Sequence, residues 1–205
     1  MAASATVEDP PLWTAASEGQ FEVQRLLDNG EDIGATGGPR AWTPREVAAM
    51  SGPVTTVQLL LDNGAEVSAK TAHGLTPLHY AARQSQAVAV VLLLIDNAAE
   101  VSAKNKVGLT PLHLATFHGH KAVVQLLIQR GAELSATTDA GLTPEDMATV
   151  GAHLQIAAML KAEALRRAQC EAFAMGQHER LGAGSWVQEL EPGVVQMIVA
   201  AMRNV

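Results

Sequence analysis

Apolar residues recur at helical spacing in several short stretches of the chain. In the stretch from Val123 to Leu127, four of the five residues are apolar and fall on or near one side of a helix with 3.6 residues per turn. We expect Leu126 of this stretch to lie in the core. Gly131 follows, in a place where a left-handed residue often closes a helix. Shorter helices are predicted over Leu78–Arg83 and Leu112–Phe117, so the pattern indicates pairs of short helices joined by tight turns.

The segments between these helices repeat along the chain. Gly-Leu-Thr-Pro-Leu-His occurs twice, Gly-Leu-Thr-Pro a third time, and Trp-Thr-Pro once; the threonines Thr43, Thr76, Thr110 and Thr143 are 33, 34 and 33 residues apart. A second motif, Leu-Leu-Asp-Asn-Gly-Ala-Glu-Val-Ser-Ala from Leu60, returns in altered form from Leu127 and keeps the same phase. Two motifs in one phase indicate tandem structural units.

A period of 33 residues around Thr-Pro-Leu-His resembles the ankyrin repeat. The resemblance covers Pro10 to Ala162. It implies an all-α fold, an ankyrin-repeat solenoid of about five helix-turn-helix repeats with β-turn fingers, plus a C-terminal helical tail. One such unit cannot bury its apolar face alone, so neighbouring units supply the core.

The repeat phase also predicts the domain organisation. Residues 1–9 are expected to form a flexible N-terminus and residues 10–162 the repeat domain, with units near 10–38, 39–71, 72–105, 106–138 and 139–162. Residues 163–205 are expected to form a helical extension, in which Glu163–Met175 is rich in strong helix formers. Two interpretations of this tail stay open. It caps the last repeat, or it docks to a larger assembly.

Several units depart from the consensus. The second reads Thr-Pro-Arg-Glu from Thr43 and the fifth Thr-Pro-Glu-Asp from Thr143, both without the histidine. The third unit is one residue longer near Ser85–Ala87 and lacks the Gly-His pair that the fourth has at Gly119. We therefore expect a distorted turn in the third unit and a weaker stack at this point.

Composition limits the classes of function. Over 205 residues the net charge is −7, and lysines and arginines mostly stand singly, which argues against a nucleic-acid surface. The lone Cys170 excludes an intrachain disulfide and a cysteine-based metal site. Met1–Asp9 lacks the features of a signal peptide, and the longest apolar run, Ala87–Ile95, is too short to span a bilayer. We expect no membrane association, a cytoplasmic or nuclear location and a monomer in the absence of partners.

Histidines are the first candidates for a metal or catalytic site. His113, His118 and His120 lie close in sequence, but His113 and His79 occupy the Thr-Pro-Leu-His position and His120 the Gly-His position. The resemblance implies that such histidines form hydrogen bonds within and between turns. No nucleophile motif, phosphate-binding loop or HExxH segment is present. We predict no enzyme, no cofactor and no metal, and an enzyme or metal protein on an ankyrin scaffold stays the less favoured alternative.

The resemblance implies that a partner protein binds on the concave side. The contact positions are finger tips, residues before Thr-Pro and residues late in the first helix. Carried over by position, they are Trp42, Met50, His73, Leu75, Arg83, Gln84, Lys106, Val107, Leu109, Phe117, His118, Asp139 and Leu142. Trp42 and Phe117 are the best anchors, because binding energy concentrates on large aromatic contacts. The alternative is that these side chains only complete the packing between units.

The predicted function is a non-catalytic protein–protein interaction module or adaptor. The alternative is a substrate-selecting subunit of a larger assembly, with the tail as docking element. A row of acidic residues follows the second helices at equivalent positions, Asp32, Glu66, Glu100 and Glu133. This acidic row is either a solvated edge or a surface that steers a basic partner.

Overall fold

The computed structural model describes residues 12, 15–16, 20–34, 43–51 and 53–179. The predicted N-terminal segment 1–9 and the last part of the predicted extension, residues 180–205, lie outside the described residues. Contacts between Cα atoms divide the chain into two units, residues 1–158 and 159–205. Helices α2 to α9, described below, lie in the first of these, and α10 begins there and continues into the second.

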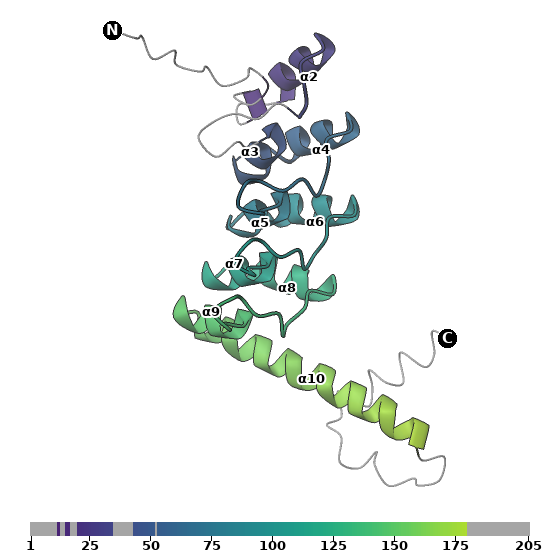
Figure 1. Ribbon diagram of the computed structural model, residues 1–205, viewed down its shortest axis with the longest axis vertical. Coiled ribbons are helices and arrows are strands. Elements are labelled where there is room, and N and C mark those ends of the chain that lie inside the picture. Colours follow the sequence, from purple (N-terminus) through teal and green to yellow (C-terminus); the bar gives the residue numbers. More distant parts are fainter. Residues whose placement is uncertain (1–11, 13–14, 17–19, 35–42, 52, 180–205) are drawn as a thin grey trace. The chain divides into compact units, whose positions relative to one another are not determined.

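The described chain is helical throughout its regular structure, and no strand occurs in these residues (Figure 1). The helices are α2 (Gln20–Asp28), α3 (Pro44–Ser51), α4 (Val54–Asp62), α5 (Pro77–Ala82), α6 (Val88–Asp96), α7 (Pro111–Phe117), α8 (Lys121–Gln129), α9 (Pro144–Val150) and α10 (Leu154–Glu179). The first helices α3, α5, α7 and α9 contact one another in succession, and so do the second helices α2, α4, α6 and α8. This two-layer stack confirms the predicted all-α repeat solenoid.

The first helices begin at the repeated Thr-Pro pairs, as the sequence predicts. The backbone N–H of Thr110 donates to Nδ1 of His113 at 3.1 Å, and the Thr110 hydroxyl lies 2.8 Å from the same nitrogen. Pro111 occupies the first helical position, where its missing N–H has no partner to lose. Where the histidine is absent, a carboxylate replaces it: the N–H of Thr143 donates to Asp146 at 2.8 Å, and Thr43 donates in the same way to Glu46.

The core consists of columns of equivalent residues in successive units. Val57, Val91 and Val124 are fully buried on the second helices, as are Leu60, Leu94 and Leu127. On the first helices the fully buried column is Ala48, Ala81, Ala115 and Ala148. Alanine allows adjacent helices to approach closely, which explains why the chain is rich in small apolar residues and poor in aromatics.

One core assignment from the sequence is wrong. Leu126, which we expected in the core, is only half-buried, whereas its neighbour Leu127 is fully buried. Both residues lie near the apolar side of α8, and the contact between α8 and α6 selects which one is enclosed.

The ends of the second helices follow one geometry. Gly64 and Gly131 adopt left-handed backbone with φ of +87° and +84°, which lets the chain leave the helix. Ala98 takes the equivalent place in the third unit, and its φ of +66° is unusual for a residue with a Cβ. The segment Glu163–Met175, predicted to be helical, is part of the single helix α10, and the predicted domain end at residue 162 falls inside that helix.

None of the helices in the described part of the chain combines the length and the apolar character needed to cross a membrane.

Candidate protein-binding surface

The fingers of units three to five are tight hairpins closed by backbone hydrogen bonds. In the fourth unit the N–H of Asn105 donates to the carbonyl of Leu109 at 3.0 Å, and Gly108 donates back to Asn105 at 3.1 Å. Thr71 and Leu75 repeat the outer bond in the third unit at 2.9 Å. The hairpins therefore hold the residue before each Thr-Pro pair in a fixed place.

Neighbouring fingers are bonded to one another. The N–H of Lys106 donates to the carbonyl of His73 at 3.1 Å, and the N–H of Asp139 donates to that of Val107 at 3.1 Å. A Cβ atom at Gly108, whose φ is +75°, would lie 2.9 Å from the Cα of Thr138. Glycine is needed there because the next finger approaches so closely. The finger tips of units three to five consequently form one continuous row.

The buried histidines connect the fingers to the first helices. His79 accepts from Thr76 through Nδ1, and its Nε2 lies 3.0 Å from the carbonyl oxygen of Leu109 in the next unit. His113 makes the same contact with Leu142 at 3.1 Å. Because Nδ1 accepts, the proton sits on Nε2, which donates. The structural role predicted for these histidines is thus visible in their contacts.

The protonation of these histidines is disfavoured. Burial lowers the pKa of His79 from 6.5 to about 4, and burial also lowers the pKa of His113. The pKa of His118 is lowered first by burial and then by the positive charge of Arg83, His120 and His153.

The ends of the first helices α7 and α9 carry exposed apolar side chains. Phe117 is the last residue of α7, is 38% exposed, and packs edge-on against His118 with ring centroids 5.2 Å apart. His118 in turn stacks on His120, whose Nε2 lies 2.8 Å from the carbonyl oxygen of Arg83. Val150 ends α9 at the position equivalent to Phe117 and is 63% exposed. The sequence analysis missed Val150, although its distance of 33 residues from Phe117 identifies it.

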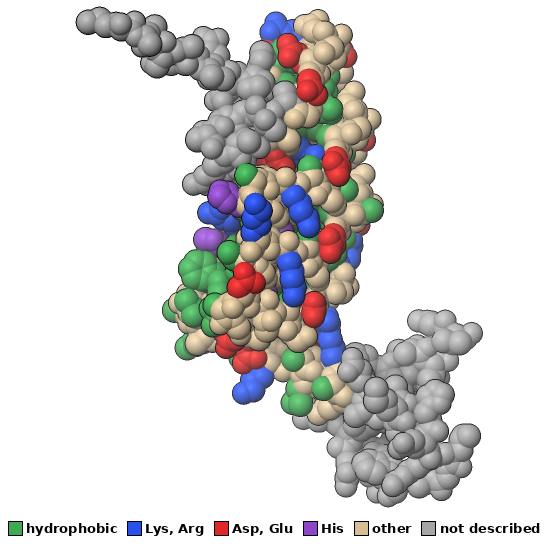
Figure 2. Space-filling view, viewed as in Figure 1, with side chains coloured by type: hydrophobic (Ala, Val, Ile, Leu, Met, Phe, Trp, Pro, Cys, Tyr) green, Lys and Arg blue, Asp and Glu red, His purple; other side chains and the backbone are tan. Residues whose placement is uncertain are grey.

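The structure distributes the predicted contact residues as follows. His73, Arg83, Lys106, Val107, Phe117, His118, Asp139 and Leu142 are exposed, and Leu75, Gln84 and Leu109 are half-buried. Trp42 lies outside the described residues, and Met50 lies in α3 with its side chain not described. We call the surface made by the finger tips, the residues before Thr-Pro and the ends of the first helices the finger face. In Figure 2, hydrophobic side chains gather at one edge of the stack beside α7 and α9.

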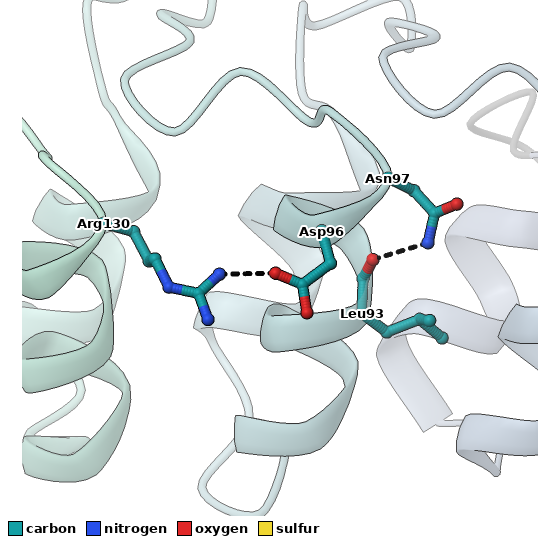
Figure 3. A network of polar contacts seen from close by, with 4 residues as sticks. All are labelled: Leu93, Asp96, Asn97 and Arg130. Atoms are coloured by element: carbon teal, nitrogen blue, oxygen red, sulfur yellow. Dashed lines mark hydrogen bonds and ion pairs between the residues drawn. The ribbon is translucent and has the colours of Figure 1, made fainter.

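The second-helix ends form a different edge. All four residues of the acidic row are exposed. Asp96 at the end of α6 pairs with Arg130 after α8 at 2.6 Å, and the Asn97 side chain donates to the carbonyl of Leu93 at 2.9 Å (Figure 3). An exposed pair of this kind contributes only about 0.2–1 kcal/mol. This edge is therefore polar, solvated and tied together weakly.

The structure offers little support for a metal or redox site. Within the described residues, no three or more His, Cys, Asp or Glu side chains lie close enough to hold a metal ion. Cys170 is half-buried in α10 and is a free thiol.

Comparison with known families agrees with this architecture. A family model described as "Ankyrin repeats (3 copies)" matches residues 12–105 and again residues 85–169. No curated protein matches the chain significantly. Ankyrin repeats are in general protein–protein interaction modules and are typically not catalytic. With its 33-residue phase, its capped first helices and its bonded fingers, the chain belongs to the ankyrin-repeat family.

Proposed function

We propose that this protein is a non-catalytic interaction module or adaptor that binds a partner protein on the finger face. The observation that carries the proposal is a set of exposed apolar side chains in successive units, made of Val107, Phe117, Leu142 and Val150. Val107 and Leu142 lie in fingers and Phe117 and Val150 lie at the ends of first helices, so all four lie outside the fully buried columns of the core. Contiguous exposed apolar surface often marks an interaction site.

The arrangement also suits binding energetically. Covering apolar surface releases about 25 cal/mol per Å². The finger tips are held by backbone hydrogen bonds between units, so little ordering is needed when a partner docks. Phe117 is the strongest anchor among the described residues, since it is aromatic, rigidly placed at a helix end and partly exposed. Trp42 is proposed as a second anchor on the evidence of its sequence position alone.

The boundaries of the binding module are part of the proposal. We place the repeat domain at residues 10–162 and a helical extension at residues 163–205, and we assign binding to the former. In this proposal the remaining predicted contacts, including Met50, Leu75, Gln84 and Leu109, contribute shape rather than anchoring energy.

Partner capture with matched variants tests the proposal. Phe117→Ala should weaken binding by about 1–2 kcal/mol, and Val150→Ala by less, without changing the melting temperature appreciably. Phe21→Ala is the control, because Phe21 is 95% exposed on α2, away from the finger face. Binding would be measured by calorimetry with a partner recovered by pull-down with the wild-type protein.

The same variants separate binding from packing. If Phe117→Ala lowers the melting temperature and leaves affinity intact, Phe117 is a packing residue and the binding surface lies elsewhere. An equal loss of affinity in Phe21→Ala would also contradict the proposal. Trp42→Ala, measured in parallel, decides whether the second anchor is correctly assigned.

A further inference from the structure

Charge is segregated in units three and four, although the whole chain carries −7. The stretches 67–95 and 101–132 contain no aspartate or glutamate. Their charged residues are all basic: Lys70, Arg83, Lys104, Lys106, Lys121 and Arg130. The acidic residues of these units are Asp96 at the end of α6, Glu100 shortly after it, and Glu133 after the end of α8. Negative charge is thus confined to the second-helix ends, and the fingers and first helices are basic.

The basic groups belong to the finger face. Lys70 and Lys104 occupy equivalent places in successive fingers, and both are exposed. The exposed Lys106 is bonded through its backbone to the finger of the exposed His73. Arg83, at the end of α5, is exposed and its carbonyl accepts from His120. In Figure 2, basic side chains lie over the middle of the stack and histidines at its left edge, while acidic side chains lie along the right edge and again at the lower left.

These cations are not neutralised within the described part of the chain. The ion pairs found there join Arg25 to Glu22, Arg130 to Asp96, and both Arg166 and Arg167 to Glu163. Lys70, Arg83 and Lys104 take part in none of them. An exposed lysine or arginine without an acidic neighbour leaves a positive potential that a complementary partner can use.

The basic region ends at the fifth unit. Asp139 stands at that finger tip, and Glu145 and Asp146 lie in the first turn of α9. The apolar side chains Val107, Phe117 and Leu142 lie where the basic units give way to this acidic one. Along the finger face, the charge therefore changes from basic in units three and four to acidic in unit five.

We propose that the partner segment taken by the finger face is an acidic peptide. Its aspartate or glutamate side chains lie over units three and four, and a large apolar side chain contacts Val107, Phe117 and Leu142. This inference rests on the proposed function and adds the chemistry of the partner. The acidic row alone would favour a basic partner. Such a partner would have to bind at the ends of the second helices, where the acidic row lies, and not on the finger face.

The test selects binders from a random-sequence peptide display library with the full-length protein. The expected peptides have a net negative charge and carry at least one aromatic or large aliphatic residue. A selected peptide, synthesised with a fluorescent label, is then titrated by anisotropy. The K70E/K104E/K106E variant should lose about tenfold or more in affinity, and the wild-type affinity should fall as salt rises.

A charge-reversed control uses the other edge. Asp62 and Glu100 are exposed beyond the second helices, so D62K/E100K changes the net charge substantially without touching the finger face and should leave affinity within about twofold. If the glutamate variant fails to fold by circular dichroism, K70Q/K104Q/K106Q replaces it and should still weaken binding.

The outcomes separate the inference from the proposed function. Selection of basic or uncharged peptides that depend on Phe117 overturns the inference and leaves the proposed function standing. A gain of affinity in D62K/E100K as large as the loss in K70E/K104E/K106E overturns it too, since net charge rather than the finger face then governs binding. Failure to select any peptide also overturns it, while the proposed function is decided by the Phe117→Ala and Phe21→Ala comparison.

Discussion

Units three and four bury residues at equivalent positions but differ in the backbone conformation of their turns. Val91 and Leu94 in α6 are as completely buried as their equivalents in α8. Between the helices, the fourth unit uses Gly119 with φ of +75° followed by His120, whereas the third runs through the exposed residues Ser85 and Gln86. At the end of the second helix the fourth unit has a left-handed glycine, and the third has Ala98.

This difference shows which parts of a repeat are constrained. A core position is fixed by the units on both sides, so a change there affects three units at once. A turn lies at the surface and its defects are local. The missing Gly-His pair of the third unit is partly compensated by its neighbour, since Nε2 of His120 in the fourth unit donates to the carbonyl of Arg83 at the C-terminal end of α5. The ring nitrogen there must donate, because a carbonyl oxygen only accepts.

The largest effect is expected from the shared core. Leu127→Ala and Leu94→Ala should each lower the free energy of unfolding by about 2–5 kcal/mol, because both leucines are fully buried between second helices. Leu126→Ala is the matched control, and it should cost clearly less because Leu126 is only half-buried. Chemical denaturation measures all three. If Leu126→Ala lowered the free energy of unfolding as much as Leu127→Ala, the difference in burial between these two leucines would not determine their contributions to stability.

Acid should weaken the stack through the buried histidines. The pKa of His79 is about 4 in the folded chain and 6.5 ordinarily, so the unfolded chain takes up the proton more readily. Stability is then complete above about pH 6.5 and falls as the pH drops from there towards about 4, by up to roughly 3 kcal/mol from this group. The lowered pKa of His113 acts in the same direction.

Denaturation curves at a series of pH values measure this loss. His79→Gln, which keeps a hydrogen-bonding side chain without a titrating group, should flatten the curve in that window. An unchanged pH profile in the variant would assign the acid sensitivity to other groups.

Hydrogen exchange should distinguish the two turns. None of the amides of Ser85, Gln86 and Ala87 donates to a backbone carbonyl in the described chain, whereas those of Gly119, His120 and Lys121 all do. Exchange in the first set should be about tenfold faster or more, because no local opening is required. Mass spectrometry of overlapping peptides measures it. Equal protection of the two turns would show that the third unit is not the weak point of the stack.

The smallest effect is expected at the helix ends. Ala98→Gly should raise the free energy of unfolding by up to about 1 kcal/mol, because glycine adopts a positive φ without steric cost. Gly131→Ala should lower it by a similar amount, and a Cβ there meets no atom within 4 Å, so the effect is conformational alone. Thermal melts of both variants measure the difference. If Ala98→Gly destabilised the protein, the contacts of the alanine methyl group would contribute more to stability than its positive φ costs.

The sequence predicts the fold well because local chemistry and repeat phase agree. Threonine and proline start the first helices, and glycine ends the second ones, at positions that the structure confirms. It predicts the burial of individual side chains less well, as Leu126 shows. Two adjacent residues near one helix face can differ in burial because of the shape of the neighbouring unit, which the sequence pattern does not reveal. His153 is a further example. It stands in the Gly-His position behind Ala152 rather than glycine, and its ring packs against Gly119.

The candidate surface is only partly legible in the sequence. Position alone identifies Phe117 and Val107, which are exposed, but it also selects Leu75 and Leu109, which the finger hairpins half-bury. The basic character of units three and four is hidden by the negative total, because acidic residues lie only a few positions away in sequence yet at the other edge of the stack. The separation of basic from acidic side chains can be recognised only when the structure shows at which edge of the stack each residue lies.

Because of the hydrogen bonds from His79 and His113, the third and fourth units each depend on the unit that follows them in the chain. Each buried Nε2–H finds its acceptor in the unit that follows, at Leu109 and Leu142, so removing units from the C-terminal side leaves a buried donor without an acceptor. Removing them from the N-terminal side leaves these histidine bonds intact, although it removes the acceptors of the Lys106 and Asp139 N–H groups. In the fifth unit Asp146 stands in the histidine's place, and a carboxylate has no proton to donate onward. Asp146 therefore carries no donor that a further unit would have to satisfy, and Glu46 in the second unit likewise offers none to the third.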